Sequence, residues 1–182
     1  MKKIAVHLAT GFEETEAVTI IDVLRRADLD VTTVSMTKSK TVTGGHQIPV
    51  VADLLFSEVD YSAIDVLVLP GGMPGAKNLD NHEGLQKQIL QFNKDNKLLG
   101  AICAAPLVFG HLGILKGKKA VCYPGFESEL HGAEILETPS IVSDNIVTGR
   151  GVGVAIKFAL QLVSELVGPE KSKQLAKAML AE

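Results

Sequence analysis

Apolar runs of strand length alternate along this chain with segments whose apolar residues repeat at helical spacing. We expect strands over residues 3–9, 31–36, 64–69 and 98–102, and helices over residues 14–28, 83–96 and 104–112. Continuous apolar runs of this kind are typical of strands that helices cover on both faces. The alternation indicates parallel strands joined by crossover helices.

The remaining segments extend this predicted α/β fold. Gly44-Gly45, between Thr-Val-Thr and Gln-Ile-Pro-Val-Val, predicts an antiparallel hairpin at a sheet edge. The other expected elements are a short strand over 120–123, two strands around a turn at 144–145, and helices over 152–167 and 169–180. No repeat or flexible linker interrupts them, and a chain of 182 residues suits one hydrophobic core. We therefore expect a single domain over residues 1–182.

Composition and charge exclude several classes of protein. With 46% hydrophobic and 21% charged residues, the chain has enough apolar surface to fold. Its formal net charge is -3 and its lysines are scattered, so we expect no nucleic-acid partner. Glycine and proline interrupt the most apolar stretch, residues 98–115, which favours a buried strand and helix over a membrane span. Residues 1–9 are interpreted as a first strand rather than a signal peptide, and the two cysteines fit a reducing, cytoplasmic compartment.

Cys103 is the leading candidate for chemistry. It lies between an expected strand and an expected helix, within Gly-Ala-Ile-Cys-Ala-Ala-Pro, where small neighbours allow a sharp turn like a nucleophile elbow. Unpaired N–H groups at a helix N-terminus favour the thiolate form. The other common fate of a free cysteine is that of a small buried apolar residue, and position alone leaves both alternatives open. Cys122 lies inside an apolar strand and is expected to point away from the face that Tyr123 occupies, without a disulfide to Cys103.

Two further segments follow strands and should reach the same edge of a parallel sheet. The amides of Gly71-Gly72 could stabilise an oxyanion, although a tight strand exit is an equally good interpretation. Glu16 falls one residue before the apolar face of its helix, so its carboxyl could point towards Cys103. An ionised carboxylate there would oppose the thiolate, whereas a protonated one would donate a hydrogen bond to the sulfur. Glu13 and Glu14 are more simply interpreted as favourable charges in a first helical turn.

The sequence predicts neither a metal nor a cofactor. The five histidines show no spacing to cysteine or carboxylates that is typical of a metal site. His46, in the hairpin, is retained as a candidate pocket residue, with an exposed turn residue as the simpler alternative. No glycine-rich segment has the spacing of a dinucleotide-binding loop.

Several segments together resemble a known family over essentially the whole chain. They are Gly11-Phe-Glu-Glu-Thr-Glu16, Asp22-Val-Leu-Arg-Arg-Ala27, Val68-Leu-Pro-Gly-Gly72 with Gly75, Ala101-Ile-Cys-Ala-Ala-Pro106, and Thr148-Gly-Arg-Gly-Val-Gly153. The chain resembles the ThiJ/PfpI superfamily, and within it the DJ-one branch, which is parkinsonism-associated and deglycase-like. The resemblance implies a flavodoxin-like three-layer sandwich and a homodimer. It also implies Cys103 as the reactive cysteine, Glu16 as its protonated partner, and the amides of Gly72 and Ala104 as oxyanion donors.

The chain departs from the family at two positions. Tyr123 stands where the branch commonly has a histidine, and Ala104 stands where the protease-like branches have one. Because a phenol titrates far above neutrality, no efficient neutral-pH base is left and a Cys-His peptidase mechanism is disfavoured. Tyr123 remains a candidate pocket residue.

The resemblance implies a cofactor-independent enzyme of the glyoxalase III or deglycase type. Cys103 would add to a small carbonyl substrate, a 2-oxoaldehyde such as methylglyoxal. The main alternative is a non-enzymatic sensor of oxidative stress in which peroxide oxidises Cys103 to a sulfinate. A third alternative is a binding scaffold that has no reactive centre.

Overall fold

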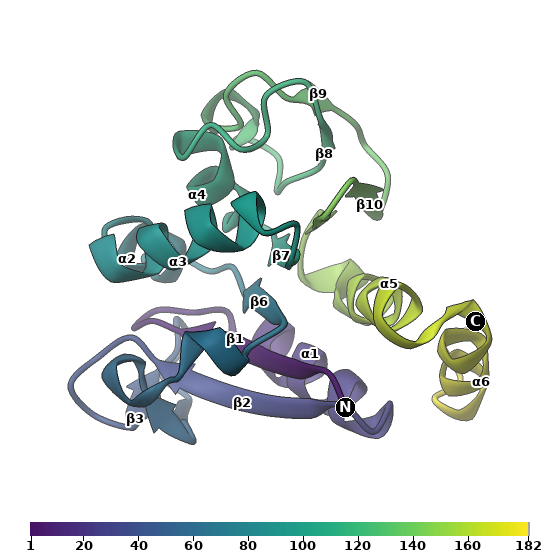
Figure 1. The fold of residues 1–182 in the computed structure, drawn as a ribbon, viewed down its shortest axis with the longest axis horizontal. Helices are drawn as coiled ribbons and strands as arrows, with labels where there is room; N and C mark the ends of the chain where they lie inside the picture. The colour runs from purple at the N-terminus through teal and green to yellow at the C-terminus, as the bar shows by residue number, and fades with distance from the viewer. Residues whose placement is uncertain (182) are drawn as a thin grey trace.

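A seven-stranded sheet forms the centre of the computed structural model, which describes residues 1–181 (Figure 1). The strand order is β10-β11-β7-β6-β1-β2-β5, and all neighbours pair in parallel except β10 and β11. The strands are β1 (Lys3–Leu8), β2 (Asp30–Ser35), β5 (Leu54–Leu55), β6 (Val66–Leu69), β7 (Leu98–Ile102), β10 (Ser140–Ser143) and β11 (Ile146–Gly149).

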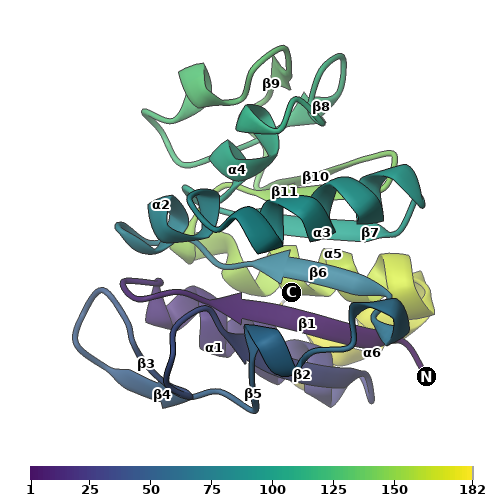
Figure 2. The same ribbon diagram turned by 60° about the vertical axis from the view of Figure 1, so that its left-hand side comes forward.

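Helices cover both faces of this sheet. One layer holds α1 (Glu14–Arg26), α5 (Ala155–Val167) and α6 (Pro169–Ala178), and the other holds α2 (Gly75–Asp80), α3 (Glu83–Lys94) and α4 (Pro106–His111). Figures 1 and 2 show α3 and α5 on opposite sides of β6 and β7. The structure therefore confirms the predicted α/β fold, a flavodoxin-like sandwich with a mostly parallel sheet.

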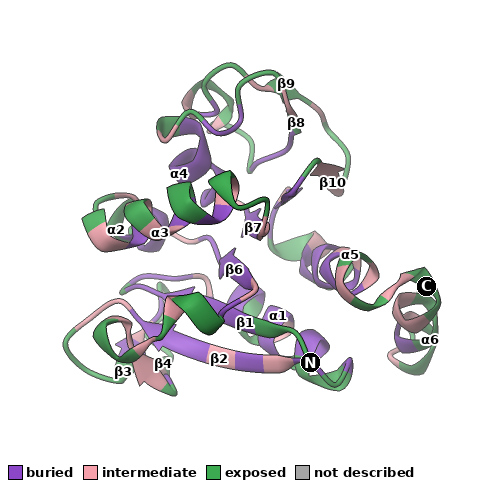
Figure 3. Cartoon of the chain, in the orientation of Figure 1, coloured by how far each residue is buried: buried purple, intermediate pink, exposed green. Residues whose placement is uncertain are grey.

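The core is divided by the alternation of side chains along the strands. Ile4 and Val6 of β1 join the apolar cluster under α1 and α5, whereas Ala5 joins the cluster under α3 and α4. Figure 3 shows β6 buried throughout and β7 buried after its first residue, Leu98, with exposed residues on the outer faces of the helices. Burial on both faces explains why these strands are continuous apolar runs in the sequence.

The predicted hairpin forms, but outside the main sheet. β3 (Thr41–Thr43) and β4 (Pro49–Val51) pair antiparallel as a separate two-stranded ladder. The Thr33 N–H of β2 donates to the carboxylate of Asp53 at 2.8 Å, so this edge amide of β2 bonds a side chain and not a strand of the hairpin. The short strand β5 then pairs with the end of β2.

The strand predicted over residues 120–123 is shorter than expected. β8 (Lys119–Ala120) pairs with β9 (Glu134–Ile135) in a second small sheet. The next amides serve other partners, because the Val121 N–H donates to Thr148 Oγ1 at 3.0 Å and the Tyr123 N–H donates to the Cys103 carbonyl at 2.8 Å.

Short 3-10 helices complete the described chain. They are η1 (Phe56–Glu58), η2 (Tyr61–Ala63), η3 (Glu127–Glu129) and η4 (Val152–Val154). Helix α4 begins at Pro106 rather than at the predicted Ala104, so Ala104 and Ala105 belong to the turn before it. Among residues 1–181, no helix has the length and apolar character needed to span a membrane.

Candidate active site at the turn after strand β7

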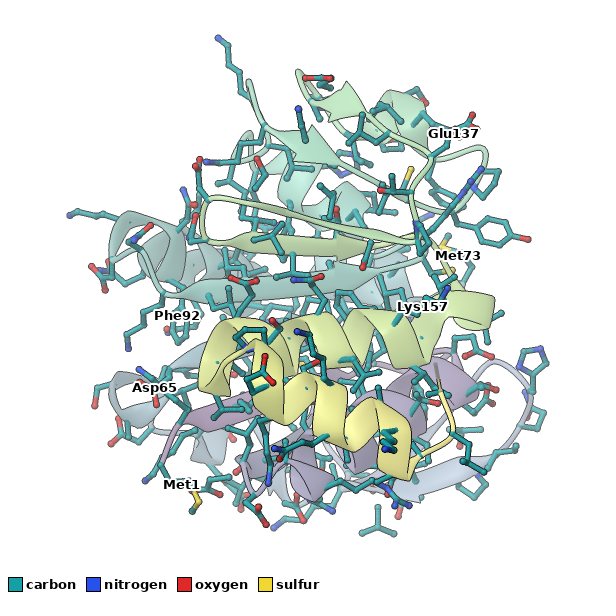
Figure 4. The ribbon with its side chains drawn as sticks, turned by 90° about the vertical axis from the view of Figure 1, so that its right-hand side faces the viewer. Met1, Asp65, Met73, Phe92, Glu137 and Lys157 are labelled. Carbon is teal, nitrogen blue, oxygen red and sulfur yellow. The ribbon has the colours of Figure 1, made fainter. Side chains whose placement is uncertain are left out.

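The carboxyl ends of the parallel strands lie at one end of the molecule. In Figure 4, Met73, which follows β6, lies at one end of the sheet, and Asp65, which precedes β6, lies at the other. The turns after β1, β6 and β7 therefore bring Glu16, Gly71 and Cys103 together, as expected for a parallel sheet.

Cys103 occupies a constrained turn directly after β7. Its φ of 65° lies in the left-handed region, which residues other than glycine seldom adopt. Its N–H donates to the Gly149 carbonyl at 2.9 Å, and its carbonyl accepts the Tyr123 N–H at 2.8 Å. These bonds from two neighbouring segments hold the unfavourable conformation, which has the form of a nucleophile elbow. The side chain is half-buried rather than enclosed in the core.

Glu16 is fully buried in the first turn of α1. Its Oε2 accepts the Gly71 N–H at 2.8 Å, while Oε1 is buried and has no hydrogen-bond partner among the described residues. Glu13 caps the helix, since its carboxylate accepts the Glu16 N–H at 2.6 Å. A buried oxygen without a donor disfavours the ionised carboxylate, so Oε1 is suited to carry a proton.

The electrostatics of Glu16 and Cys103 are linked. Burial raises the pKa of Glu16 to about 7, although the Gly71 amide and the Cys103 thiol act to lower it. Burial and the charge of Glu16 raise the pKa of Cys103 to about 12, although the amides of Gly72 and Ala104 act to lower it. Among the described residues, the carboxyl of Glu16 and the thiol of Cys103 make no direct hydrogen bond, but each group shifts the pKa of the other.

At a pH between these two pKa values, Glu16 and Cys103 together hold one proton, because two adjacent negative charges repel. The nearby amides were expected to favour the thiolate, and burial together with the Glu16 charge outweighs them. A thiolate at Cys103 thus requires the shared proton to lie on Glu16.

Both glycines after β6 are required for the close approach of these groups. A Cβ on Gly71 would lie 2.6 Å from the Cβ of Cys103 and 2.7 Å from Glu16 Oε2. Gly72 has a φ of 89°, and a Cβ there would lie 2.4 Å from the backbone nitrogen of Glu13. The amides of Gly72 and Ala104 act to lower the pKa of the Cys103 thiol.

Tyr123 adjoins the site through its backbone alone. Its side chain is 48% exposed and lies beside Gly151, and its hydroxyl has no hydrogen-bond partner within residues 1–181. Cys122 is 4% exposed and packs in the core near α4, and burial raises its pKa to about 11. The expected burial is present, although strand alternation does not explain it, because β8 ends at Ala120.

His46 contacts Glu14 rather than Cys103. Its N–H donates to Glu14 Oε1 at 2.6 Å, and its Nδ1 lies 2.9 Å from Glu14 Oε2. This hydrogen bond raises the pKa of His46, whereas for Glu14 the bonds from the hairpin outweigh the effect of burial and lower the pKa. The histidine thus fastens the β3–β4 hairpin to α1, with an exposed ring at the rim.

Three supporting groups were not predicted. The Gly71 amide holds Glu16, the Gly149 carbonyl holds the Cys103 N–H, and Glu13 caps the helix that carries Glu16. The glycine doublet after β6 and the Thr148–Gly153 segment were visible in the sequence, but the contacts that they make depend on the fold.

The fold and this arrangement define a class: flavodoxin-like proteins with a cysteine at a constrained turn beside a buried carboxyl group. Residues 2–165 match the DJ-1/PfpI family, and the chain belongs to this family, as the resemblance predicted.

Several relatives align with nearly the whole chain. It is 33% identical to Protein dj-1beta of Drosophila melanogaster, over 98% of this chain and 97% of the relative. It is 30% identical to the Glutathione-independent glyoxalase DJR-1.2 of Caenorhabditis elegans, over 92% of this chain and 89% of the relative. Protein DJ-1 homolog B of Arabidopsis thaliana is 42% identical over 96% of this chain. The chain spans less than half the length of that protein and of the related homolog A, with 40% and 46% covered.

Solved structures agree with the fold. The structure of Toxoplasma gondii DJ-1, described as oxidized, superposes with a TM-score of 0.95 at 38% identity, covering 99% of this chain and 98% of that one. Drosophila melanogaster DJ-1beta superposes with a TM-score of 0.93 at 32% identity, covering 100% of this chain and 98% of that one.

Proposed function

We propose that this protein is a cysteine-dependent enzyme of the glyoxalase III or deglycase type, which acts on small 2-oxoaldehydes or their adducts. The observation that supports this proposal most strongly is the position of Cys103. It lies at a constrained turn beside the buried carboxyl of Glu16 and the amides of Gly72 and Ala104. A relative named as a glutathione-independent glyoxalase supports this assignment.

The first step forms a carbon–sulfur bond. With the shared proton on Glu16, the sulfur of Cys103 attacks the aldehyde carbon of a substrate such as methylglyoxal. The carbonyl π electrons move to oxygen, where the amides of Gly72 and Ala104 stabilise the charge until a proton arrives from Glu16. The product of this step is a hemithioacetal on Cys103.

The second stage moves hydrogen within the bound substrate. Glu16 takes the proton from the former aldehyde carbon and returns it to the neighbouring carbon, while the hydroxyl proton of the hemithioacetal passes to the neighbouring carbonyl oxygen. The first carbon is thereby oxidised to a thioester carbonyl and the second is reduced to an alcohol. Water then hydrolyses the resulting thioester, releasing lactate and restoring the Cys103 thiol. The net reaction adds one water to methylglyoxal and needs no external oxidant or cofactor.

Turnover by Cys103→Ser tests this proposal. We expect methylglyoxal consumption to fall to the uncatalysed rate, while circular dichroism shows an intact fold. Cys122→Ser is the matched control, because its thiol lies in the core, and it should keep its activity. Glu16→Gln should slow turnover by about 10²–10⁴-fold as the proton carrier is lost. A fully active Cys103→Ser variant would remove this residue from the mechanism.

A second candidate function is that of an oxidative-stress sensor. The Toxoplasma gondii relative has been solved in an oxidized form, and the same surroundings could hold a sulfinate at Cys103. Two peroxide molecules would each transfer one oxygen to the sulfur and leave as water. Mass spectrometry after mild peroxide should then find two added oxygens on Cys103 and few on Cys122. Equal oxidation of both cysteines would exclude the sensor.

We also propose that residues 1–182 act as one domain that pairs as a homodimer in the cytoplasm. The dimer is implied by the family resemblance alone. Light scattering on the purified protein would test it, and a monomeric mass at micromolar concentration would contradict it.

A further inference from the structure

A second group of ligating side chains lies where α4 ends against η3, and it shares no residue with the Cys103 site. His111 ends α4, Glu129 ends η3, and His131 follows two residues later. Each offers one ligand atom, and these three atoms lie within 4.8 Å of one another. We propose that this cluster binds a divalent transition-metal ion of the Zn²⁺ type.

The orientation of His111 supports this proposal. Its Nδ1 lies 2.9 Å from Oδ2 of Asp80, the last residue of α2. Metal-binding histidines usually donate their other ring N–H to a carboxylate, which fixes the tautomer and makes the ligating nitrogen more basic. With Nδ1–H donated to Asp80, Nε2 is the nitrogen that faces Glu129 Oε2, 2.7 Å away, and it is the atom left to ligate a metal.

The charges around His111 suit a cation. The His111 ring lies between two carboxylates, with Nδ1 2.9 Å from Asp80 Oδ2 and Nε2 2.7 Å from Glu129 Oε2. A metal ion bound at Nε2 would take the place of a proton between His111 and Glu129. Together the two carboxylates balance the charge of a divalent ion.

His131 is free to become the third ligand. Its ring lies 5.3 Å from the ring of His111, measured between centroids, and the two planes are inclined by 30°. The residue is exposed and makes no hydrogen bond with another residue in the range 1–181. Turning its imidazole towards a metal would therefore break no hydrogen bond of the described structure.

The dimensions fit a tetrahedral ion after a small adjustment. Bonds of about 2.0–2.2 Å place two tetrahedral ligands about 3.3 Å apart, so the 2.7 Å contact between His111 and Glu129 must open by about 0.6 Å. The Glu129 side chain is 43% exposed and can make this movement. A cavity of about 410 Å³, lined by Asp80, His111, Phe126 and Glu129, leaves a fourth position open for water. Figure 2 shows α4 between α2 and the β8–β9 segment, the three regions that this ion would join.

The ligand set also selects the type of metal. Two imidazole nitrogens and one carboxylate oxygen suit Zn²⁺, Cu²⁺ or Ni²⁺, whereas Mg²⁺ and Ca²⁺ require oxygen ligands. The sequence predicted no metal site because His111 and Glu129 are 18 residues apart, outside any recognised ligand spacing.

Zinc titration of the full chain tests the proposal. The purified protein, stripped with a chelator, is titrated with zinc chloride against a chromophoric zinc indicator. We expect one equivalent to bind and His131→Ala to weaken binding by at least about tenfold. Asp80→Asn should also weaken binding, because it removes the carboxylate that accepts the Nδ1–H of His111. His46→Ala is the matched control, because it removes an exposed histidine from the other acidic cluster, formed with Glu13 and Glu14. That variant and Cys103→Ser should bind zinc as the wild type does.

Three results would overturn the proposal. They are no zinc binding at one equivalent, unchanged affinity in His131→Ala, and loss of binding in His46→Ala or Cys103→Ser, which would place the metal elsewhere. The His131→Ala variant should fold, because the His131 side chain makes no hydrogen bond in the described structure. The zinc affinity of His131→Ala therefore tests the proposal even if Asp80→Asn does not fold. The Co²⁺ complex gives a second readout: its absorption should lack a thiolate charge-transfer band.

Discussion

Replacing Glu16 with glutamine isolates the effect of its charge on the sulfur. In the wild type the Gly71 N–H donates to Glu16 Oε2 at 2.8 Å. Glutamine keeps an oxygen that can accept this hydrogen bond, and its amide nitrogen can donate towards Cys103. The carboxylate is one of the causes that raise the pKa of Cys103 to about 12. We therefore expect Glu16→Gln to lower the pKa of the thiol.

The size of the shift follows from Coulomb's law. Two unit charges about 4 Å apart repel by about 4 kcal/mol at an effective dielectric constant of about 20. At about 1.36 kcal/mol per pKa unit, this repulsion corresponds to about three units. Because the Cys103 side chain is only half-buried, solvent screens part of the interaction, and we expect a decrease of about one to three units.

The pH dependence of alkylation measures this shift. In a Cys122→Ser background, the rate of reaction with iodoacetamide reports the thiolate of Cys103 alone. The wild type should show a first rise near pH 7, where the pair loses one proton, and then a plateau set by the fraction with its proton on Glu16. Glu16→Gln should show a single rise at the lowered pKa of the thiol. Identical profiles in the two proteins, or a higher pKa in the variant, would refute the coupling.

Three further outcomes are expected. Gly71→Ala should lower the free energy of unfolding by about 1–3 kcal/mol and slow alkylation, because its Cβ would lie 2.6 Å from the Cβ of Cys103. Gly153→Ala, whose Cβ would meet no atom within 4 Å, is the control and should match the wild type. Glu13→Ala should cost about 1 kcal/mol in urea unfolding as α1 loses its cap, and an unchanged midpoint would contradict the cap. Burial lowers the pKa of His7 from 6.5 to about 4, so the unfolded chain binds a proton that the folded chain does not. Stability should therefore fall by about 3 kcal/mol as the pH falls from about 6.5 to about 4, and His7→Gln should lack this part of the loss.

The long elements could be predicted from the sequence because their burial leaves a periodic signal. β7 has the predicted limits, since a strand covered on both faces is a continuous apolar run. The six-residue helix α2 and the two-residue strands β5 and β8 were missed or misplaced. Elements so short carry no periodicity, and a tertiary contact, such as that of the Val121 amide with Thr148, decides where β8 ends.

The candidate site was predictable in position but not in electrostatics. The turn after β7 and the apolar face of α1 were enough to bring Cys103 and Glu16 to one place. The pKa of the sulfur depends on its depth and on a carboxylate from a distant segment, so local sequence could not show that burial outweighs the amides. For the same reason, the contact of His46 with Glu14 appeared only in the fold.

Substrate protection of Cys103 tests the central claim most directly. A brief iodoacetamide pulse near pH 8, with and without methylglyoxal, is followed by peptide mass spectrometry of both cysteines. We expect the label on Cys103 and little on buried Cys122, and we expect methylglyoxal to suppress it. Equal labelling of the two cysteines, or labelling of Cys103 that methylglyoxal leaves unchanged, would contradict the assignment of Cys103 as the group that attacks the aldehyde.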